Sequence, residues 1–225
     1  MILVAGFVSL GNWQLGRAQE KRALLAMYAE RAQAEPVPIA FGAEDPGSLR
    51  FRHVQAFGRY DLSRQMLLDN QVRDGRAGYL VLTPLRIPGR PEAVLVDRGW
   101  VPQGATRQEL PDLGFEVADE RVVGTIYAPL AGGFRLGTLD AGAAGWPRIV
   151  QYMDFPAMAE RLGYPLAPFV LRLDPDQPHG YRRDWAPIAF TPERHAAYAV
   201  QWFAMAAAVL ILYFTLNLKR VRDDA

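Results

Sequence analysis

The sequence predicts a membrane α+β protein in which two transmembrane helices, one at each end, flank an antiparallel β-rich domain of barrel or sandwich type. Three observations lead to this fold class. An uncharged apolar run occupies residues 196–218, a second apolar stretch opens the chain, and short strand-like runs fill the part from 51 to about 174. Because 22% of all residues are charged, we expect the middle of the chain to fold as a water-soluble domain.

The opening stretch, MILVAGFVSLGNWQLGR, predicts a first transmembrane helix over residues 1–15, with Trp13 at the membrane interface. It lacks the basic start and the small-residue cleavage motif of a secretory signal. A helix of this length is ~22 Å long, which is short of the ~30 Å hydrocarbon core of a bilayer. We therefore expect the first span to be clipped at its start. The alternative is a buried helix of a soluble protein.

Residues 16–49 are expected to form a helical extension and a loop. Apolar residues, including Leu24 and Tyr28, stand among charges and predict that the helix continues over 16–34, until Pro36 and Pro38 end it. The segment AFGAEDPGSL that follows is rich in turn-forming residues and predicts a loop.

Residues 50–190 are expected to form the β-rich domain and a juxtamembrane segment. Runs rich in Val, Leu, Ile and Tyr are separated by Gly, Pro, Asp and Asn: FRHVQAFGRY, MLLDN, GYLVLTPLR, EAVLVDRGWV, ERVVGTIYA, RIVQYMD and FVLRLD. The spacings are too short for helical crossovers, which favours antiparallel pairing in a small barrel or sandwich. One short helix is predicted at DFPAMAERLG, with Asp154 as its N-cap.

Residues 191–218 are expected to form the second transmembrane helix. Thr191 is a suitable N-cap and Pro192 suits the first helical position. The run that follows is ~34 Å long as a helix, enough to cross the hydrocarbon core. The tail, 219–225, carries three basic residues that predict a cytoplasmic location: Lys219, Arg220 and Arg222. Both termini are then cytoplasmic, and the β-rich domain lies on the outer side of the membrane.

Composition excludes several classes of function. The chain has no cysteine, which excludes disulfides, thiolate metal sites, iron–sulfur clusters and covalently attached c-type haem. A net charge of +1, with the basic residues dispersed, gives no reason to expect nucleic acid binding. No glycine-rich phosphate loop, nucleophile elbow or serine–histidine pairing is present, so no enzymatic activity is expected. A cofactor that brings its own equatorial ligands, such as haem, needs only one or two of the three histidines.

Two polar clusters at predicted strand ends are interpreted as structural. They are DNQ at 69–71 and DRGW at 97–100, where Asp and Asn end strands and Gly99 is suited to a tight turn. His53 lies on a predicted strand and is also interpreted as structural, whereas His179 is expected in a loop near the outer membrane face.

His195 is the candidate ligand. It is the fourth residue of the second span if Pro192 is the first, so the positive end of the helix dipole and the nearby hydrocarbon both favour a neutral imidazole. The neutral ring is the form that coordinates a metal. Tyr198 and Trp202 follow at i+3 and i+7 and make an aromatic face beside it. The alternative is an interfacial polar cap beneath an aromatic belt.

Five stretches occur in order between Gly11 and Arg220: GNWQLGRAQEK, VLTPL, VLVDRGWVP, QYMD and PERHAAYAVQWFAMAAAVLILYFTLNLKR. With them the chain resembles the Surfeit locus protein 1 family, the Shy-type assembly factors of haem–copper cytochrome c oxidase. The resemblance implies two spans, a β-rich domain on the outer side and no catalytic reaction. It also implies haem a as the cofactor, bound through a histidine of the second span. His195 is the residue here that matches.

The resemblance implies that the protein assists the insertion or retention of haem a in the large subunit of cytochrome c oxidase. The setting is the inner membrane of a bacterial cell, with haem a synthase as a further partner. The alternative is a scaffold or accessory protein that binds oxidase subunits, during assembly or in the finished complex, without carrying haem. Small residues of the second span support this alternative because they permit close helix contacts: Ala204, Ala206, Ala207 and Ala208.

Overall fold

The computed structural model describes residues 2–42, 45–104, 109–114, 119–129, 145–185 and 191–223. The chain divides into a helical unit, Met1–Glu30 with Ala186–Ala225, and a β-unit, Arg31–Trp185. Several predicted parts include residues outside this description: Met1 of the first span, residues 43 and 44 of the loop, residues 105–108, 115–118, 130–144 and 186–190 of the β-rich domain and juxtamembrane segment, and the last two residues of the tail. The side chains of residues 218–223 are also outside it.

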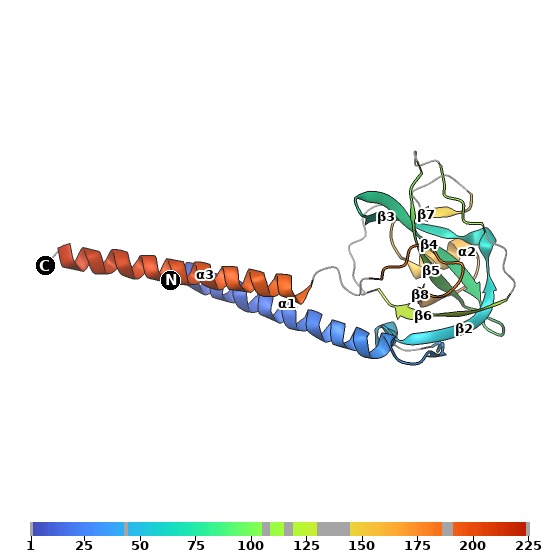
Figure 1. Cartoon of the computed structure of the whole chain (residues 1–225), viewed down its shortest axis with the longest axis horizontal. Coiled ribbons are helices and arrows are strands. Elements are labelled where there is room, and N and C mark those ends of the chain that lie inside the picture. Colours follow the sequence, from blue (N-terminus) through green and yellow to red (C-terminus); the bar gives the residue numbers. More distant parts are fainter. Residues whose placement is uncertain are drawn as a thin grey trace. The chain divides into compact units, whose positions relative to one another are not determined.

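The helical unit consists of two long helices, α1 (Ile2–Ala32) and α3 (Pro192–Asp223), which lie side by side (Figure 1). They run antiparallel, because Phe7 stacks on Trp202 and Gln14, later on α1, meets His195, earlier on α3. Gly11 allows this close approach, since a Cβ atom at its position would lie 2.5 Å from the Phe203 ring. Close packing through a glycine is typical of helix pairs in membranes.

One described helix segment, Pro192–Asn217, is long and apolar enough to cross a membrane, with a mean hydropathy of 1.9. This finding supports the predicted second span. Helix α1 does not meet the same measure of length and hydropathy. The first span therefore stays a prediction.

The described part of the β-unit contains eight strands: β1 (Val37–Pro38), β2 (His53–Tyr60), β3 (Met66–Arg73), β4 (Arg76–Arg86), β5 (Ala93–Pro102), β6 (Glu120–Tyr127), β7 (Arg148–Val150) and β8 (Leu166–Leu173). Each of the seven predicted runs contributes a strand. Strand β1 lies between the predicted helix and the predicted loop and was missed, because a two-residue strand has no detectable periodicity.

Five of the strands close into a barrel in the order β2–β6–β8–β5–β4, and β4 then returns to β2. Strand β4 is eleven residues long, so one of its edges can pair with β3 near its start and with β2 near its end. Apolar side chains from all five strands fill the interior, among them Val54, Leu85, Val96, Ile126 and Phe169. The prediction of a barrel-like sheet is confirmed.

The prediction of antiparallel pairing is wrong for three pairs, β1–β2, β3–β7 and β5–β8, which run parallel. The prediction took the connections to be too short for crossovers, but long stretches of chain separate β1 from β2, β5 from β6 and β6 from β7. Strands β5 and β8 are separated by β6, β7 and helix α2 (Phe155–Leu162), which leaves enough chain for a crossover.

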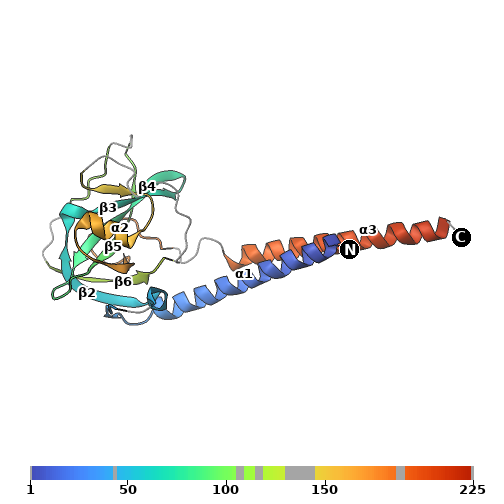
Figure 2. The same cartoon turned by 180° about the vertical axis from the view of Figure 1, so that it is seen from behind.

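Helix α2 covers the outer side of the sheet (Figure 2), where its buried Met158 and Leu162 join a second apolar cluster with Met66, Leu82 and Val170. The predicted N-cap is confirmed, since the Ala157 backbone N–H donates to Asp154 Oδ1 over 3.1 Å. Gly163 ends the helix in the left-handed conformation.

Gly99 was expected in a tight turn, but it lies inside β5, at a bulge. Asp97 pairs with Leu82 and Trp100 with Leu80, so Arg98 and Gly99 together stand opposite a single residue of β4. The φ of Gly99 is +112°, and a Cβ atom there would lie 2.7 Å from the Arg182 carbonyl oxygen. Both constraints favour glycine at this position.

Candidate functional site

His195 lies on the side of α3 that faces α1. Helix α3 begins at Pro192, which makes His195 its fourth residue, as expected from the sequence. Its Nδ1 atom lies 2.8 Å from the side-chain oxygen of Gln14 on α1. The predicted ligand is therefore bonded to the neighbouring helix of the same unit.

The contact with Gln14 selects the tautomer of the neutral imidazole. An amide oxygen only accepts hydrogen bonds, so Nδ1 must carry the proton and donate it to Gln14 Oε1. In the neutral ring the lone pair is then on Nε2, which makes Nε2 the nitrogen that is able to coordinate a metal. Metal-binding histidines commonly donate their other N–H in this way, because the bond sets both the tautomer and the ring orientation.

Trp202 and Tyr198 differ in their surroundings. Trp202 stacks on Phe7 of α1, with 5.7 Å between the ring centroids and an interplanar angle of 30°. Tyr198 is 48% exposed. Positions i and i+7 of a helix differ by ~20° around the axis, whereas i and i+3 differ by ~60°. His195 and Trp202 thus face α1, and Tyr198 extends the aromatic surface to the side.

The DRGW segment of β5 forms a buried polar core in the β-unit. The Arg98 side chain is almost fully buried and donates from Nε to the His179 carbonyl over 2.8 Å and from Nη1 to Gln65 Oε1 over 3.0 Å. Its guanidinium also lies 4.9 Å from the centre of the Tyr181 ring. These contacts join β5 to the segment that follows β8, which supports the structural interpretation of this cluster.

Asp97, next to Arg98, is only 1% exposed. Its Oδ1 atom accepts the Gly99 N–H, but Oδ2 has no hydrogen-bond partner among the described residues. Burial raises the pKa of Asp97 to about 6, and the charge of Arg172 offsets part of this effect.

The other two histidines belong to the β-unit. Both ring nitrogens of His53 lie 2.6 Å from an oxygen, Nδ1 from the Ala34 carbonyl and Nε2 from the Asp174 carboxylate. These bonds connect the start of β2 to the segment just before β1 and to the residue just after β8, which supports the structural interpretation. His179 lies 3.8 Å from Glu120, in the loop after β8.

A model of the SURF1 family matches residues 1–207, a range that includes Gln14, His195, Tyr198 and Trp202. The chain belongs to the SURF1 family. It is 25% identical to Surfeit locus protein 1 of Takifugu rubripes, over 99% of this chain and 97% of that protein. It is 24% identical to the protein of that name from Rattus norvegicus and 25% identical to the one from Homo sapiens, which it covers over 75% and 74% of their lengths.

In this SURF1 family member, sequence reasoning singled out His195 as a candidate ligand but did not identify Gln14, to which it is hydrogen-bonded. Gln14 stands 181 positions earlier in the chain, and nothing in its local sequence marks it as a bonding partner. Phe7 was read only as part of an apolar stretch. Both residues meet α3 only because α1 lies beside it.

Proposed function

We propose that this SURF1 family protein is an assembly factor for haem–copper cytochrome c oxidase. It binds haem a at α3 and assists its insertion into the large subunit, or its retention there, without catalysing a reaction. The observation that carries the proposal is the bond from His195 Nδ1 to Gln14 Oε1, which prepares Nε2 of the same ring as a ligand. Membership of the SURF1 family is consistent with this role.

The residues at the helix pair fit a haem. A porphyrin supplies four nitrogens of its own, so one histidine is enough to hold its iron from the protein side. His195 would coordinate the iron, and Gln14 would keep its ring in the required tautomer. Phe7, Tyr198 and Trp202 offer aromatic surface for the porphyrin. When bound, haem a supplies the redox-active iron that the oxidase requires.

We further propose that α1 and α3 both span the inner membrane of a bacterial cell. Both termini are then cytoplasmic and the β-unit is periplasmic. The apolar α3 segment and the basic residues after it support this topology. The proposed partners are the large oxidase subunit, which receives the haem, and haem a synthase, which makes it.

Replacing His195 with alanine tests the proposal. The change removes the imidazole but keeps a strong helix former, so protein level and membrane insertion should stay normal. We expect haem a occupancy, read from the α-band of protein purified in detergent with haem a available, to fall strongly. Unchanged occupancy together with an unchanged spectrum contradicts the proposal.

Two further variants separate ligation from packing. Tyr198→Phe keeps the aromatic ring on the same helix and should retain the haem. Gln14→Leu removes the acceptor of the Nδ1 proton without removing the ligand, so we expect a shifted α-band and weaker binding rather than complete loss. If His195→Ala only shifts the band, aromatic packing rather than ligation holds most of the haem.

The second candidate function is a scaffold that binds oxidase subunits without haem. Ala204, Ala207 and Ala208 are exposed along α3, which leaves small side chains available for close contact with another helix. A parent protein that co-purifies with oxidase subunits, yet shows no haem a absorbance when haem a is available, favours this candidate.

A further inference from the structure

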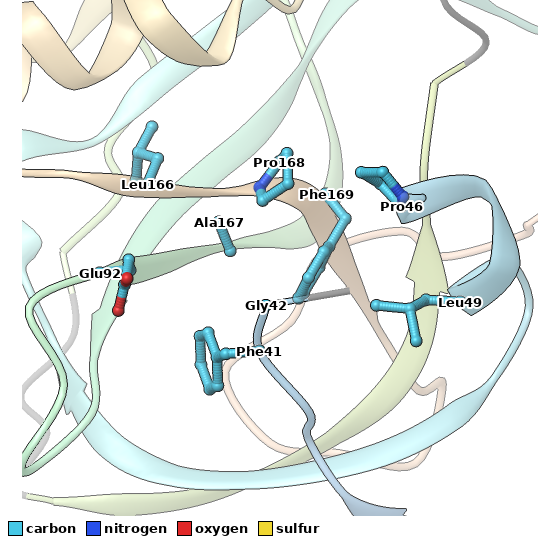
Figure 3. Close-up of a pocket in the computed structure, with 9 residues that line it drawn as sticks. All are labelled: Phe41, Gly42, Pro46, Leu49, Glu92, Leu166, Ala167, Pro168 and Phe169. Atoms are coloured by element: carbon cyan, nitrogen blue, oxygen red, sulfur yellow. The ribbon is translucent and has the colours of Figure 1, made fainter. Parts of the chain in front are cut away.

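A cavity of about 200 Å³ lies at one end of the barrel (Figure 3). Its walls come from the loop after β1, the short 3-10 helix Pro46–Leu49, the residue before β5, and the start of β8. Most of the lining is apolar and includes Phe41, Leu49, Ala167 and Phe169. An apolar cavity of ~150 Å³ holds a benzene molecule, so this one has room for a group of that size.

Glu92 is the one ionisable residue in the described lining of this cavity. Its Oε2 atom is buried and has no hydrogen-bond partner among the described residues. Arg90, the nearest cation along the chain, lies over the Phe41 ring, 4.9 Å from its centre, and forms no ion pair with Glu92 in the described structure. A carboxylate that lines an apolar cavity and has no ion pair among the described residues is unfavourable, and a cation inside the cavity would compensate its charge.

We propose that this cavity binds an ammonium group carried on an apolar stem. The apolar walls accommodate the stem, and the ammonium donates hydrogen bonds to Glu92 while its charge compensates the carboxylate. The aromatic rings of Phe41 and Phe169 favour a cation over an anion. A small amine and the lysine side chain of a partner protein have this chemistry in common. The inference is independent of haem binding by the helical unit.

The test uses the full chain in detergent with isotope-labelled methyl groups at Leu49, Leu166 and Ala167. Three probes are titrated: benzylammonium chloride, benzyl alcohol as the neutral compound of the same shape, and a short lysine peptide capped at both ends. We expect benzylammonium to shift the methyl resonances saturably and to bind about tenfold more tightly than benzyl alcohol. The alcohol can donate only a neutral hydrogen bond to Glu92, whereas the ammonium also compensates the charge of the carboxylate. Glu92→Gln should remove that difference while leaving weak binding of the alcohol.

The outcomes distinguish a small amine from a lysine side chain of a partner protein, and they can overturn the proposal. Saturable shifts with the peptide as well as benzylammonium identify a lysine side chain, and shifts with benzylammonium alone identify a small amine. Equal affinity for benzylammonium and benzyl alcohol in the parent protein overturns the proposal, as does the absence of any shift. This comparison needs no variant, so it holds even if Glu92→Gln folds poorly.

Discussion

At the scale of single residues, Asp97 is a carboxylate whose burial makes the stability of the barrel depend on pH. Its pKa is about 6 in the folded protein, against an ordinary value of 3.8. Between these values the folded state holds a proton that the unfolded state has released, so this residue's contribution to stability falls as pH rises through that window. The difference between the two pKa values corresponds to about 3 kcal/mol.

Asp97→Asn should therefore stabilise the protein at neutral pH relative to the parent. The free energy of unfolding, measured by urea titration in detergent, should differ little between the two proteins at pH 4. The difference in favour of the variant should grow by up to about 3 kcal/mol towards pH 7. Asp176→Asn, which removes an exposed carboxylate, is the control. A difference between variant and parent that does not change with pH contradicts the assignment of this effect to Asp97.

Gly99→Val should destabilise the β-unit, because the bulge requires a positive φ and the added side chain collides with the Arg182 carbonyl. Backbone strain and collision together should cost about 2 kcal/mol or more in the free energy of unfolding. Gly89→Val is the matched control, since Gly89 also has a positive φ (+76°) but open space around its Cβ position. Equal losses for the two variants would mean that the contact with Arg182 contributes nothing.

At the scale of elements, the contact between α1 and α3 depends on Gly11. Gly11→Leu should separate the helices there, because its side chain meets the Phe203 ring. The chain has no native cysteine, so cysteines introduced at Phe7 and Trp202 can report the separation through a short thiol crosslinker. We expect the crosslinking yield to fall several-fold in Gly11→Leu. Gly6→Leu and Gly16→Leu, where nothing lies within 4 Å, should crosslink like the parent.

The elements also show what could be predicted from the sequence. Local runs of residues predicted seven of the strands and the capped helix α2, because local propensity and turn residues determine those features. The parallel β5–β8 pair and the return of β4 to β2 could not be predicted, since they depend on contacts between segments far apart in the chain. The same reason separates His195, which its local sequence makes a candidate, from Gln14, which becomes a candidate only because α1 lies against α3.

At the scale of the whole molecule, the proposed topology makes a direct prediction. A reporter enzyme fused after Ala225 should be active only as a cytoplasmic fusion, and one inserted near Gly47 only in the periplasm. The reason is that two spans return the chain to the side on which it started, with the basic residues after α3 inside. A periplasmic reporter at Ala225, or a cytoplasmic one at Gly47, rejects the two-span arrangement.

The return of β4 to β2 gives the barrel a seam. Two residue pairs form its ladder, Tyr60 with Leu85 and Arg59 with Arg86, and the second sets two like charges opposite each other. One further backbone bond, from the Asp61 N–H to the Pro84 carbonyl, crosses beside them. A closed ring of strands offers no free edge to another chain, whereas the same strands opened at one place offer two. Opening the β2–β4 pairing would therefore add two strand edges to those that β1 and β7 already present, so the resistance of the described sheet to edge-to-edge aggregation depends in part on one of its two shortest pairings.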